Sequence, residues 1–219
     1  ENVHVLLMPS QFSSDHSVDD ARILAENLGA RYQIVPITQT FATLTQTLGP
    51  IFGELPFDVT EEYMQARLRG MMLMALSNKF GHILLNTSNK SESAVGYGTL
   101  YGDSVGAISI IGDLYKSEVY DLARYINRNG EIIPSNTILK APSAELRPNQ
   151  KDSDTLLPYD ILDAILYRML EEGQSREEII NAGFDEEDVY HACRAACWAR
   201  TGSCRSPAAT VVNLRKLLR

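Results

Sequence analysis

The chain has 219 residues, of which 44% are hydrophobic, and this is enough for one large core rather than two small ones. A formal net charge of −8 argues against electrostatic binding to nucleic acid or to an anionic membrane over a broad surface. No apolar run approaches the roughly 18 residues of a membrane span, and the N-terminus does not resemble a secretion signal. We therefore expect a soluble, cytoplasmic protein with a small-molecule site.

The first segments predict a strand, a helix and a second strand. The apolar run Val3–Met8 is typical of a buried strand, and Ser17 is expected to cap a helix over Val18–Leu28. The second strand is expected over Tyr32–Ile37. Because parallel neighbours need a crossover of this length, the predicted fold class is α/β with a parallel sheet.

A long helix, a strand and a glycine-rich loop are expected next. The middle of the helix Thr60–Phe80 is apolar on every face over Gly70–Leu76, which predicts burial in the core or at a subunit interface. A buried strand is expected over His82–Asn86, followed by a polar loop of the kind that binds ligands beside a parallel sheet. Later helices are expected at Lys116–Asn127, Tyr159–Glu172, Ser175–Asn181 and Asp185–Ala199.

Three cysteines lie near the C-terminus, at Cys193, Cys197 and Cys204. An odd number does not make a closed disulfide framework and fits a reducing compartment. With His191 they resemble a zinc cluster in composition, but there is no paired C-x-x-C. We interpret them as reduced cysteines, most of them on a helix.

The residues Thr87–Glu92 directly follow the strand expected at His82–Asn86. They offer hydroxyls, an amide, an ammonium and a carboxylate, and Glu92 suits Mg²⁺, which prefers carboxylate and phosphate oxygens together with water. An ordinary helix start, with Ser88 or Asn89 as its cap, explains the same residues. The six residues alone leave both interpretations open.

Four further residues offer basic or hydroxyl groups. Arg67 and Arg69 are two residues apart on a helix, so they are predicted to point to different sides, either toward two anionic groups or into solvent. Lys116, just before a helix, is a candidate for phosphate contact or a surface lysine. Ser143 lies in Ser143–Pro148, which has no periodicity and is typical of a simple connection.

Four long segments, taken in order, resemble NAD synthetase, and the resemblance covers roughly residues 3–190. The segments are MPSQFSSDHSVDDA (Met8–Ala21), QARLRGMMLMALSNKFG (Gln65–Gly81), NTSNKSESAVGYGTLYGD (Asn86–Asp103) and PSAELRPNQKDSDTLLPYDILDAIL (Pro142–Leu166). The resemblance implies a Rossmann-like, doubly wound parallel sheet of the adenine nucleotide α-hydrolase type. The last two segments favour this family over other ATP pyrophosphatases of the same fold.

The resemblance also implies a ligase reaction with ATP as co-substrate and Mg²⁺ as cofactor. ATP adenylates the nicotinate carboxylate of deamido-NAD and releases pyrophosphate, and ammonia then displaces AMP to give NAD. No side-chain nucleophile, and so no catalytic side chain, is required. Family members form homodimers with the dinucleotide across the interface, which gives the apolar stripe Met71–Leu76 a role.

Roles for individual residues are implied by the resemblance alone. The positions expected to contact ATP are Met8, Pro9, Ser10, Arg69, Thr87, Lys116 and Ser143. Those expected on the deamido-NAD side are Arg67, Tyr97 and Asp103. Glu92 matches a Mg²⁺ ligand.

Two departures from the family pattern limit these expectations. The family's Ser-Gly-Gly-x-Asp-Ser loop, which cradles pyrophosphate, would precede Glu1, so the first strand and loop are missing and the chain alone is expected to be inactive. The family domain is expected over residues 1–198, with a tail of unclear nature at 199–219 where the family's basic run is not recognisable.

Other functions remain open on this sequence. They are a degenerate relative that binds nucleotide without catalysis, another ATP pyrophosphatase such as a GMP- or tRNA-modifying enzyme, and an interaction module. The nitrogen source is free ammonia or glutamine supplied through a fused glutaminase domain. The stretch Ala144–Gln150, with Lys151–Asp154 after it, favours the glutamine-dependent branch.

Overall fold

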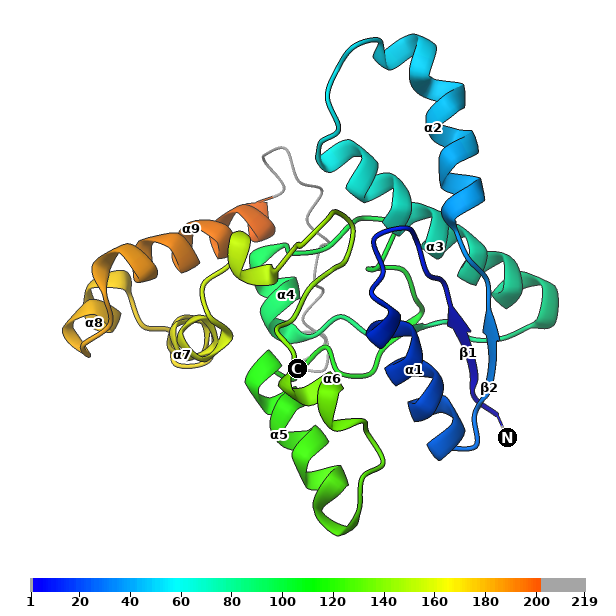
Figure 1. Cartoon of the computed structure of the whole chain (residues 1–219). Helices are drawn as coiled ribbons and strands as arrows, with labels where there is room; N and C mark the ends of the chain where they lie inside the picture. The colour runs from blue at the N-terminus through cyan, green and yellow to red at the C-terminus, as the bar shows by residue number, and fades with distance from the viewer. Residues whose placement is uncertain (1, 202–219) are drawn as a thin grey trace. The chain divides into compact units, whose positions relative to one another are not determined.

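The computed structural model describes residues 2–201, and the chain divides into two compact units (Figure 1). Unit 1 comprises Glu1–Leu84 and Tyr120–Thr155, and unit 2 comprises Leu85–Val119 and Leu156–Arg219. Among the described residues, no helix is both long and apolar enough to cross a membrane. Residues 202–219, and with them Cys204 and most of the expected tail, lie outside the described part.

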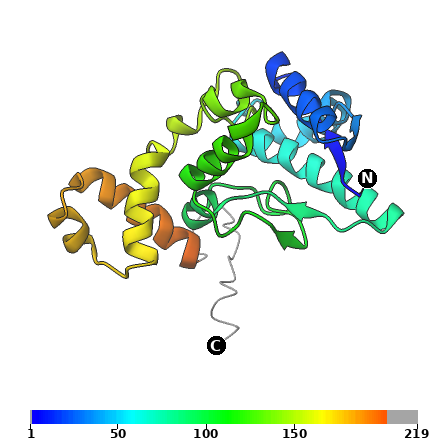
Figure 2. The ribbon, with the colours of Figure 1, turned by 90° about the horizontal axis from the view of Figure 1, so that it is seen from below.

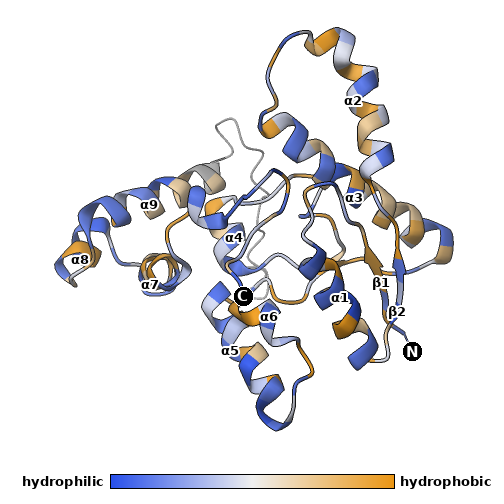
Figure 3. Ribbon diagram, viewed as in Figure 1, coloured by the Kyte–Doolittle hydropathy of each residue, from blue (hydrophilic) through white to orange (hydrophobic). Residues whose placement is uncertain are grey.

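Unit 1 begins with the predicted strand, helix and strand (Figure 1). The strands β1 (His4–Leu7) and β2 (Arg31–Ile34) pair in parallel and are joined by α1 (Asp15–Asn27). Most of β1 is apolar (Figure 3). The parallel α/β arrangement expected from the sequence is confirmed here.

The boundaries of these elements differ from the prediction for local reasons. Ser14, rather than Ser17, is the N-cap of α1, because the Ser14 side chain accepts a hydrogen bond from the Ser17 amide at 3.2 Å. β2 ends at Ile34 instead of Ile37. Pro36 has no N–H to offer a neighbouring strand, so the ladder cannot continue through it.

The helix α2 (Thr38–Phe52) was not among the helices expected from the sequence. It is rich in threonine, which has a modest helix propensity, and Pro50 lies inside it. The hydroxyls of Thr43, Thr45 and Thr47 each donate to the carbonyl four residues earlier, so these polar groups are satisfied within the helix.

The long helix α3 (Val59–Phe80) confirms the prediction for Thr60–Phe80. Asp58 caps its N-terminus in a capping box with Glu61, and Gly81 ends it in the left-handed conformation. Its first half contributes Met64 and Leu68 to a small core with α2. A polar cap and an apolar face therefore fix where this helix starts and how it packs.

The second half of α3 corrects one expectation. Its apolar residues were expected to be buried on every face, yet the exposed fraction of Met71 is 59% and that of Met74 is 37%. Met72, Leu73 and Leu76 of the same stripe are partly buried. The core alternative therefore fails for Met71 and Met74, and a subunit interface remains as a proposal.

The remaining elements of unit 1 follow α5 (Lys116–Ile126), which starts in unit 2 and continues into unit 1. They are η1 (Asn127–Asn129), α6 (Ser135–Leu139) and η2 (Asp152–Asp154). Asn136 of α6 donates to Asp20 of α1 at 2.6 Å, which ties this region to the strand and helix layer.

Unit 2 contains a second parallel strand pair and a helical core. The strands are β3 (Leu85–Asn86) and β4 (Ile108–Ser109). The helices are α4 (Lys90–Val95), α7 (Tyr159–Leu170), α8 (Arg176–Asn181) and α9 (Glu186–Thr201) (Figure 2). The core is formed by Tyr115, Leu162, Ile165, Leu166, Ile179, Val189, Ala192, Cys193 and Ala196.

The buried strand expected over His82–Asn86 is wrong in its extent. β3 has only two residues, and the exposed fraction of Ile83 is 67%. β3 pairs with β4 over only two residues, and this short ladder does not extend to the apolar residues before it. Farther along the chain, Cys193 and Cys197 lie on α9 and form no disulfide among the described residues, as expected for helix cysteines.

Candidate functional site

In unit 1, the predicted ATP-contacting residues gather where β1 ends. The Arg69 guanidinium donates from Nε to the Met8 carbonyl at 3.0 Å, so two of the predicted residues are in direct contact. None of the ion pairs found among the described residues includes Arg69. Burial lowers the pKa of Arg69, and the nearby charge of Glu145 only partly opposes this. Arg69 is therefore a largely buried cation that Glu145 balances only partly and that forms no ion pair among the described residues.

The turn after β1 is held by its own hydrogen bonds. The Ser10 amide donates to Ser13 Oγ at 3.0 Å, and Ser10 Oγ accepts from the Phe12 amide at 3.2 Å. The Pro9 carbonyl accepts from the Ile37 amide at 2.9 Å. Ser10 is buried, so the predicted residues Pro9 and Ser10 lie in a rigid turn rather than a free loop.

The segment that contains Ser143 is an ordered loop rather than a simple connection. Ser143 Oγ donates to the Gln150 carbonyl at 2.6 Å and accepts from the Glu145 amide at 3.1 Å. Glu145 has a φ of 50°, in the left-handed region that non-glycine residues rarely adopt. These bonds close the loop on itself and turn the Glu145 side chain toward α1.

The Glu145 carboxylate binds the start of α1. It accepts from the Ser14 amide at 3.2 Å, the Ser14 hydroxyl at 2.9 Å and the Ser17 hydroxyl at 2.6 Å, and forms an ion pair with Lys140 at 3.5 Å. Burial raises the pKa of this carboxyl, but the hydrogen bonds from Ser17 and Ser14 and the Lys140 charge together lower it. Glu145 is therefore a well-stabilised anion at a helix N-terminus.

The same loop is also bound to α3. Gln65 is fully buried and donates from Nε2 to the Leu146 carbonyl at 2.8 Å. Gln150 donates to Glu62 at 3.2 Å, and Arg147 pairs with Glu62 at the same distance. The loop therefore joins α1 to the helix that carries Arg69.

Arg67 and Arg69 point to different sides of α3, as their spacing predicts. Arg67 is exposed and its guanidinium lies over the Tyr63 ring, 5.6 Å from the centroid. Arg69 instead turns toward Met8. The two arginines therefore serve different surfaces of one helix.

In unit 2, Glu92 has the helix-start role considered for it from the sequence and also forms an ion pair with Lys116. Asn89 caps α4, and Glu92 completes the capping box by accepting from the Asn89 amide at 3.3 Å. The other carboxylate oxygen accepts from Lys116 Nζ at 3.1 Å. Both side chains are about one-fifth exposed, at 20% and 21%. The helix-start interpretation is correct, and it leaves Glu92 paired with a second predicted site residue.

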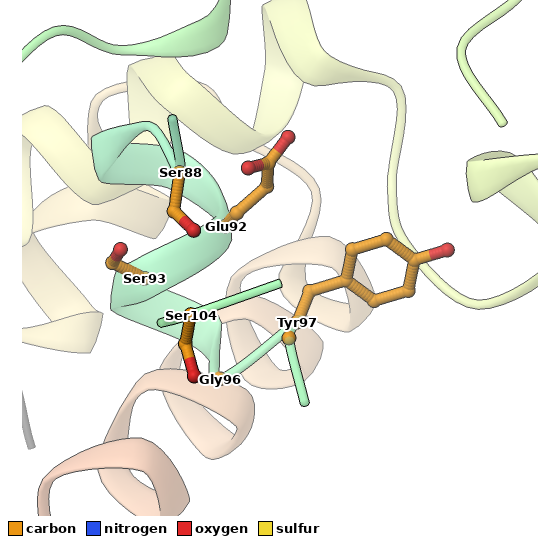
Figure 4. Close-up of a pocket in the computed structure, with 7 residues that line it drawn as sticks. Ser88, Glu92, Ser93, Gly96, Tyr97 and Ser104 are labelled. Carbon is orange, nitrogen blue, oxygen red and sulfur yellow. The ribbon is translucent and has the colours of Figure 1, made fainter. Parts of the chain in front are cut away.

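A small pocket adjoins this ion pair (Figure 4). It is about 20 Å³, room for roughly one water molecule. Glu92 lies in the first turn of α4, and Tyr97 follows Gly96, which ends the helix in the left-handed conformation. The pocket is lined by Ser88, Glu92, Ser93, Gly96, Tyr97, Gly98 and Ser104.

The other predicted residues of unit 2 surround the end of β3. Thr87 and Asp103 are exposed. Asp103 accepts from the Thr99 amide at 2.8 Å, and its carbonyl accepts from Asn86 Nδ2 at 3.2 Å. Asn86 Oδ1 accepts from the Ser88 amide at 2.9 Å, so this buried side chain joins the two segments that carry the candidates.

The donor set fits a Mg²⁺ ion that is brought by a nucleotide better than a resident metal. Among the described residues, there is no cluster of three or more His, Cys, Asp or Glu side chains that could hold an ion. Glu92 supplies one carboxylate, and Mg²⁺ is commonly held by one or two carboxylates together with substrate phosphates and water. A single carboxylate is therefore sufficient only when phosphate oxygens complete the shell.

Several residues that organise the site were missed from the sequence. They are Gln65, Asn86, Ser91, Glu145 and Asp163. Each is a polar side chain that acts through contacts with distant segments. No local pattern marks such a residue, although the clustering of Glu145 beside Ser143 in an aperiodic segment was a usable signal.

Comparison with known proteins identifies the family. A sequence profile described as NAD synthase matches residues 1–198. The glutamine-dependent NAD(+) synthetase of Synechocystis is 54% identical over 194 residues, which are 89% of this chain and 35% of that protein. The chain spans about a third of the length of the curated relatives it matches.

Solved structures agree with the sequence comparison. A glutamine-dependent NAD+ synthetase from Acinetobacter baumannii, solved with ADP, has a TM-score of 0.60 and 39% identity, over 94% of this chain and 38% of that one. An NH3-dependent NAD synthetase from Campylobacter jejuni has a TM-score of 0.68 and 28% identity, over 90% and 73% of the two chains. These similarities support the expected fold of the adenine nucleotide α-hydrolase type, and the chain belongs to the NAD synthase family.

Proposed function

We propose that the complete natural polypeptide that carries this sequence, called the intact protein below, amidates deamido-NAD to NAD with ATP. In the first step, a nicotinate carboxylate oxygen attacks the α-phosphorus of ATP, and the bond to pyrophosphate breaks. In the second, ammonia attacks the activated carbonyl carbon, loses a proton, and AMP departs. The carboxylate is a poor electrophile until its oxygen becomes part of a phosphate leaving group.

The observation that carries this proposal is the Lys116–Glu92 pair at 3.1 Å. A triphosphate gives the Lys116 ammonium a new anionic partner, which frees Glu92 Oε1 to accept a cation bound to the same phosphates. The pair thus has the composition needed to receive a metal–nucleotide complex. Lys116 and Glu92 are already adjacent, so no rearrangement of unit 2 is needed to bring them together.

In unit 1, Arg69 supports the same step from the end of β1. Its buried guanidinium has one hydrogen bond to Met8 and no carboxylate partner among the described ion pairs. Electrostatic stabilisation is strongest where a fixed charge is shielded from water. We assign Arg69 to the charge that grows on the phosphates, and the Met8–Ser10 turn and Ser143 to nucleotide binding. Thr87 is assigned to the same nucleotide.

Mg²⁺ bound with ATP would supply positive charge that polarises the phosphates and eases pyrophosphate departure. Glu92 would hold it, and Lys116 would contribute a second positive charge. Arg67, Tyr97 and Asp103 are assigned to deamido-NAD. Arg67 and Asp103 are exposed, and Tyr97 lines the pocket beside Glu92.

The nitrogen source is proposed from the relatives. The curated relatives of this chain are described as glutamine-dependent. We infer that ammonia is released from glutamine elsewhere in the intact protein and reaches the adenylated carboxylate. Free ammonia remains the chemical nucleophile in either case.

The exposed apolar stripe of α3 is proposed to form a homodimer interface. Met71 is 59% exposed and Met74 is 37% exposed, on a helix whose other half is packed. Burying such side chains between two copies removes apolar surface from water. Met71→Asp should therefore shift the intact protein toward monomer in analytical ultracentrifugation. A dimer that persists at the same concentration would rule out this surface.

The function is tested directly with the intact protein. Incubation with ATP, Mg²⁺, deamido-NAD and glutamine should yield NAD, AMP and pyrophosphate in equal amounts, as followed by chromatography. Omitting deamido-NAD should abolish AMP release. Formation of AMP and pyrophosphate only with a different acceptor, such as a nucleotide base or tRNA, would assign the chain to another ATP pyrophosphatase activity.

A further inference from the structure

The N-terminus of α5 is capped by side chains from two other helices, α4 and α7. Helix starts leave N–H groups without partners, and these are usually satisfied by a Ser, Thr, Asp or Asn directly before the helix. Here Tyr115 occupies that place, and its side chain is buried in the unit 2 core. The Lys116 amide instead donates to Ser91 Oγ at 2.8 Å, and the Ser117 amide donates to Asp163 Oδ2 at 2.8 Å.

Asp163 links α7 to both other helices through this contact. Its second oxygen accepts from the Ser91 hydroxyl, which in turn accepts from the Lys116 amide. Asp163 is 5% exposed and Ser91 is completely buried. None of the ion pairs among the described residues includes Asp163, so its charge is balanced by hydrogen bonds and by the positive end of α5.

The sequence neighbours of these bonded residues are the two partners of the candidate ion pair. Ser91 directly precedes Glu92 on α4, and Ser117 directly follows Lys116 on α5. One oxygen of the Asp163 carboxylate therefore binds the side chain of the residue before Glu92, and the other binds the backbone amide of the residue after Lys116. A shift of either helix changes the 3.1 Å separation between Lys116 Nζ and Glu92 Oε1.

We propose that Asp163 is a positioning residue that sets Lys116 against Glu92 for nucleotide binding, with Ser91 as its relay. The proposal rests on the assignment of Lys116 and Glu92 to the metal–nucleotide complex. Asp163 is not proposed to touch substrate and acts through the Ser91 hydroxyl and the Ser117 amide. A displacement of about 1 Å in a binding group can reduce the reaction rate about 100-fold. Asp163 can therefore affect catalysis without touching substrate if its loss displaces Lys116 or Glu92.

The test compares variants of the intact protein. Asp163→Ala is expected to lower kcat/KM for ATP by about 10- to 100-fold, while KM for deamido-NAD changes by less than about threefold. Asp163→Asn should recover activity to within about threefold, because its amide still accepts from Ser117 and donates to Ser91. Leu166→Ala, which removes a fully buried side chain from the same helix, is the control for loss of stability.

A second readout is independent of turnover. In hydrogen exchange of the free protein, the Lys116 and Ser117 amides should lose protection in Asp163→Ala and keep it in Leu166→Ala, when both are compared under conditions where they are folded. Ser91→Ala removes only the relay hydroxyl. It should cause loss of protection at the Lys116 amide and a smaller loss in kcat/KM for ATP than Asp163→Ala. This milder variant keeps the test decisive if Asp163→Ala does not fold.

The possible outcomes separate two failures. If Lys116→Ala and Glu92→Gln leave kcat/KM for ATP unchanged, the proposed function of the pair is wrong. If those variants are impaired while Asp163→Ala and Ser91→Ala stay within about twofold of the parent, only the positioning role is wrong. Equal kinetic losses in Leu166→Ala and Asp163→Ala at equal melting temperature would likewise reduce Asp163 to a structural residue.

Discussion

The two units hold their candidate cations in opposite ways. In unit 1, Arg69 is largely buried and bonds a backbone carbonyl, with no carboxylate partner among the described ion pairs. In unit 2, Lys116 is already paired with Glu92 at 3.1 Å. In the first case an incoming anion compensates a buried charge that Glu145 only partly balances, whereas in the second it must displace or bridge an existing pair.

The two sites should therefore respond differently to a ligand. A buried guanidinium whose pKa is lowered by burial is unfavourable without an anion, so phosphate binding there gains free energy from compensation. The Lys116–Glu92 pair has little to gain from an anion alone, because its cation is already compensated. Binding becomes favourable when a phosphate and a cation arrive together, because the phosphate can pair with Lys116 and the cation with Glu92.

The largest effect is expected for Glu92→Gln in the intact protein. Removing the carboxylate charge removes the proposed Mg²⁺ ligand while keeping size, so kcat should fall by about 10²- to 10³-fold and the Mg²⁺ requirement should rise. Steady-state assays with varied Mg²⁺ measure both. Glu172→Gln, at an exposed ion pair on unit 2, is the matched control. Unchanged metal dependence would leave Glu92 with only its capping role.

A smaller loss is expected for Arg69→Ala, in the ATP step. Removing the guanidinium takes away a buried positive charge near developing phosphate charge, which costs about 2–3 kcal/mol, or about 30- to 150-fold in kcat/KM for ATP. The melting temperature should hardly change, because the cost of burying the charge is removed together with the side chain. A large loss of stability with normal ATP kinetics would show instead that the Met8 contact is structural.

Arg67→Ala should have a smaller and different effect, although it lies on the same helix. Arg67 is exposed, so its removal should raise KM for deamido-NAD by about 10-fold and leave KM for ATP within about twofold. Varying each substrate in turn separates the two constants. If Arg67→Ala and Arg69→Ala show one shared defect, the division of the helix into an ATP side and a dinucleotide side is wrong.

The sequence predicted well what depends on neighbouring residues. The helix expected over Thr60–Phe80 matches α3 to within one residue at its start and ends at the same residue, and the spacing of Arg67 and Arg69 predicted their divergence. It failed where burial depends on distant partners. The apolar run before β3 was expected to be buried, but a two-residue ladder with β4 leaves Ile83 exposed.

For the candidate site, the sequence singled out candidate residues by their chemical type, but it did not reveal the contacts that position them. Glu92 and Lys116 were both singled out, but their direct pairing is a property of how α4 and α5 meet. Asp163 lies 46 residues beyond the amide it caps, Ser117, and no local pattern signals such a bond. Residues that touch ligand are constrained by chemical type, whereas residues that position them are constrained only by geometry.

The smallest predicted effect concerns Glu145, whose contact with α1 belongs to the unit that holds Arg69. Its pKa is lowered in the folded chain, so it stabilises the fold above the unfolded pKa of about 4.3, and this contribution is lost as pH falls through the lower folded value. Glu145→Gln should therefore lower the melting temperature at pH 7 by about 2 °C. The difference should shrink as the pH is reduced below about 4, where the parent carboxyl is also protonated. Thermal melts across this range measure it, with exposed Glu54→Gln as the control. A difference that stays constant with pH would mean that the Glu145 hydrogen bonds, rather than its charge, hold the loop against α1.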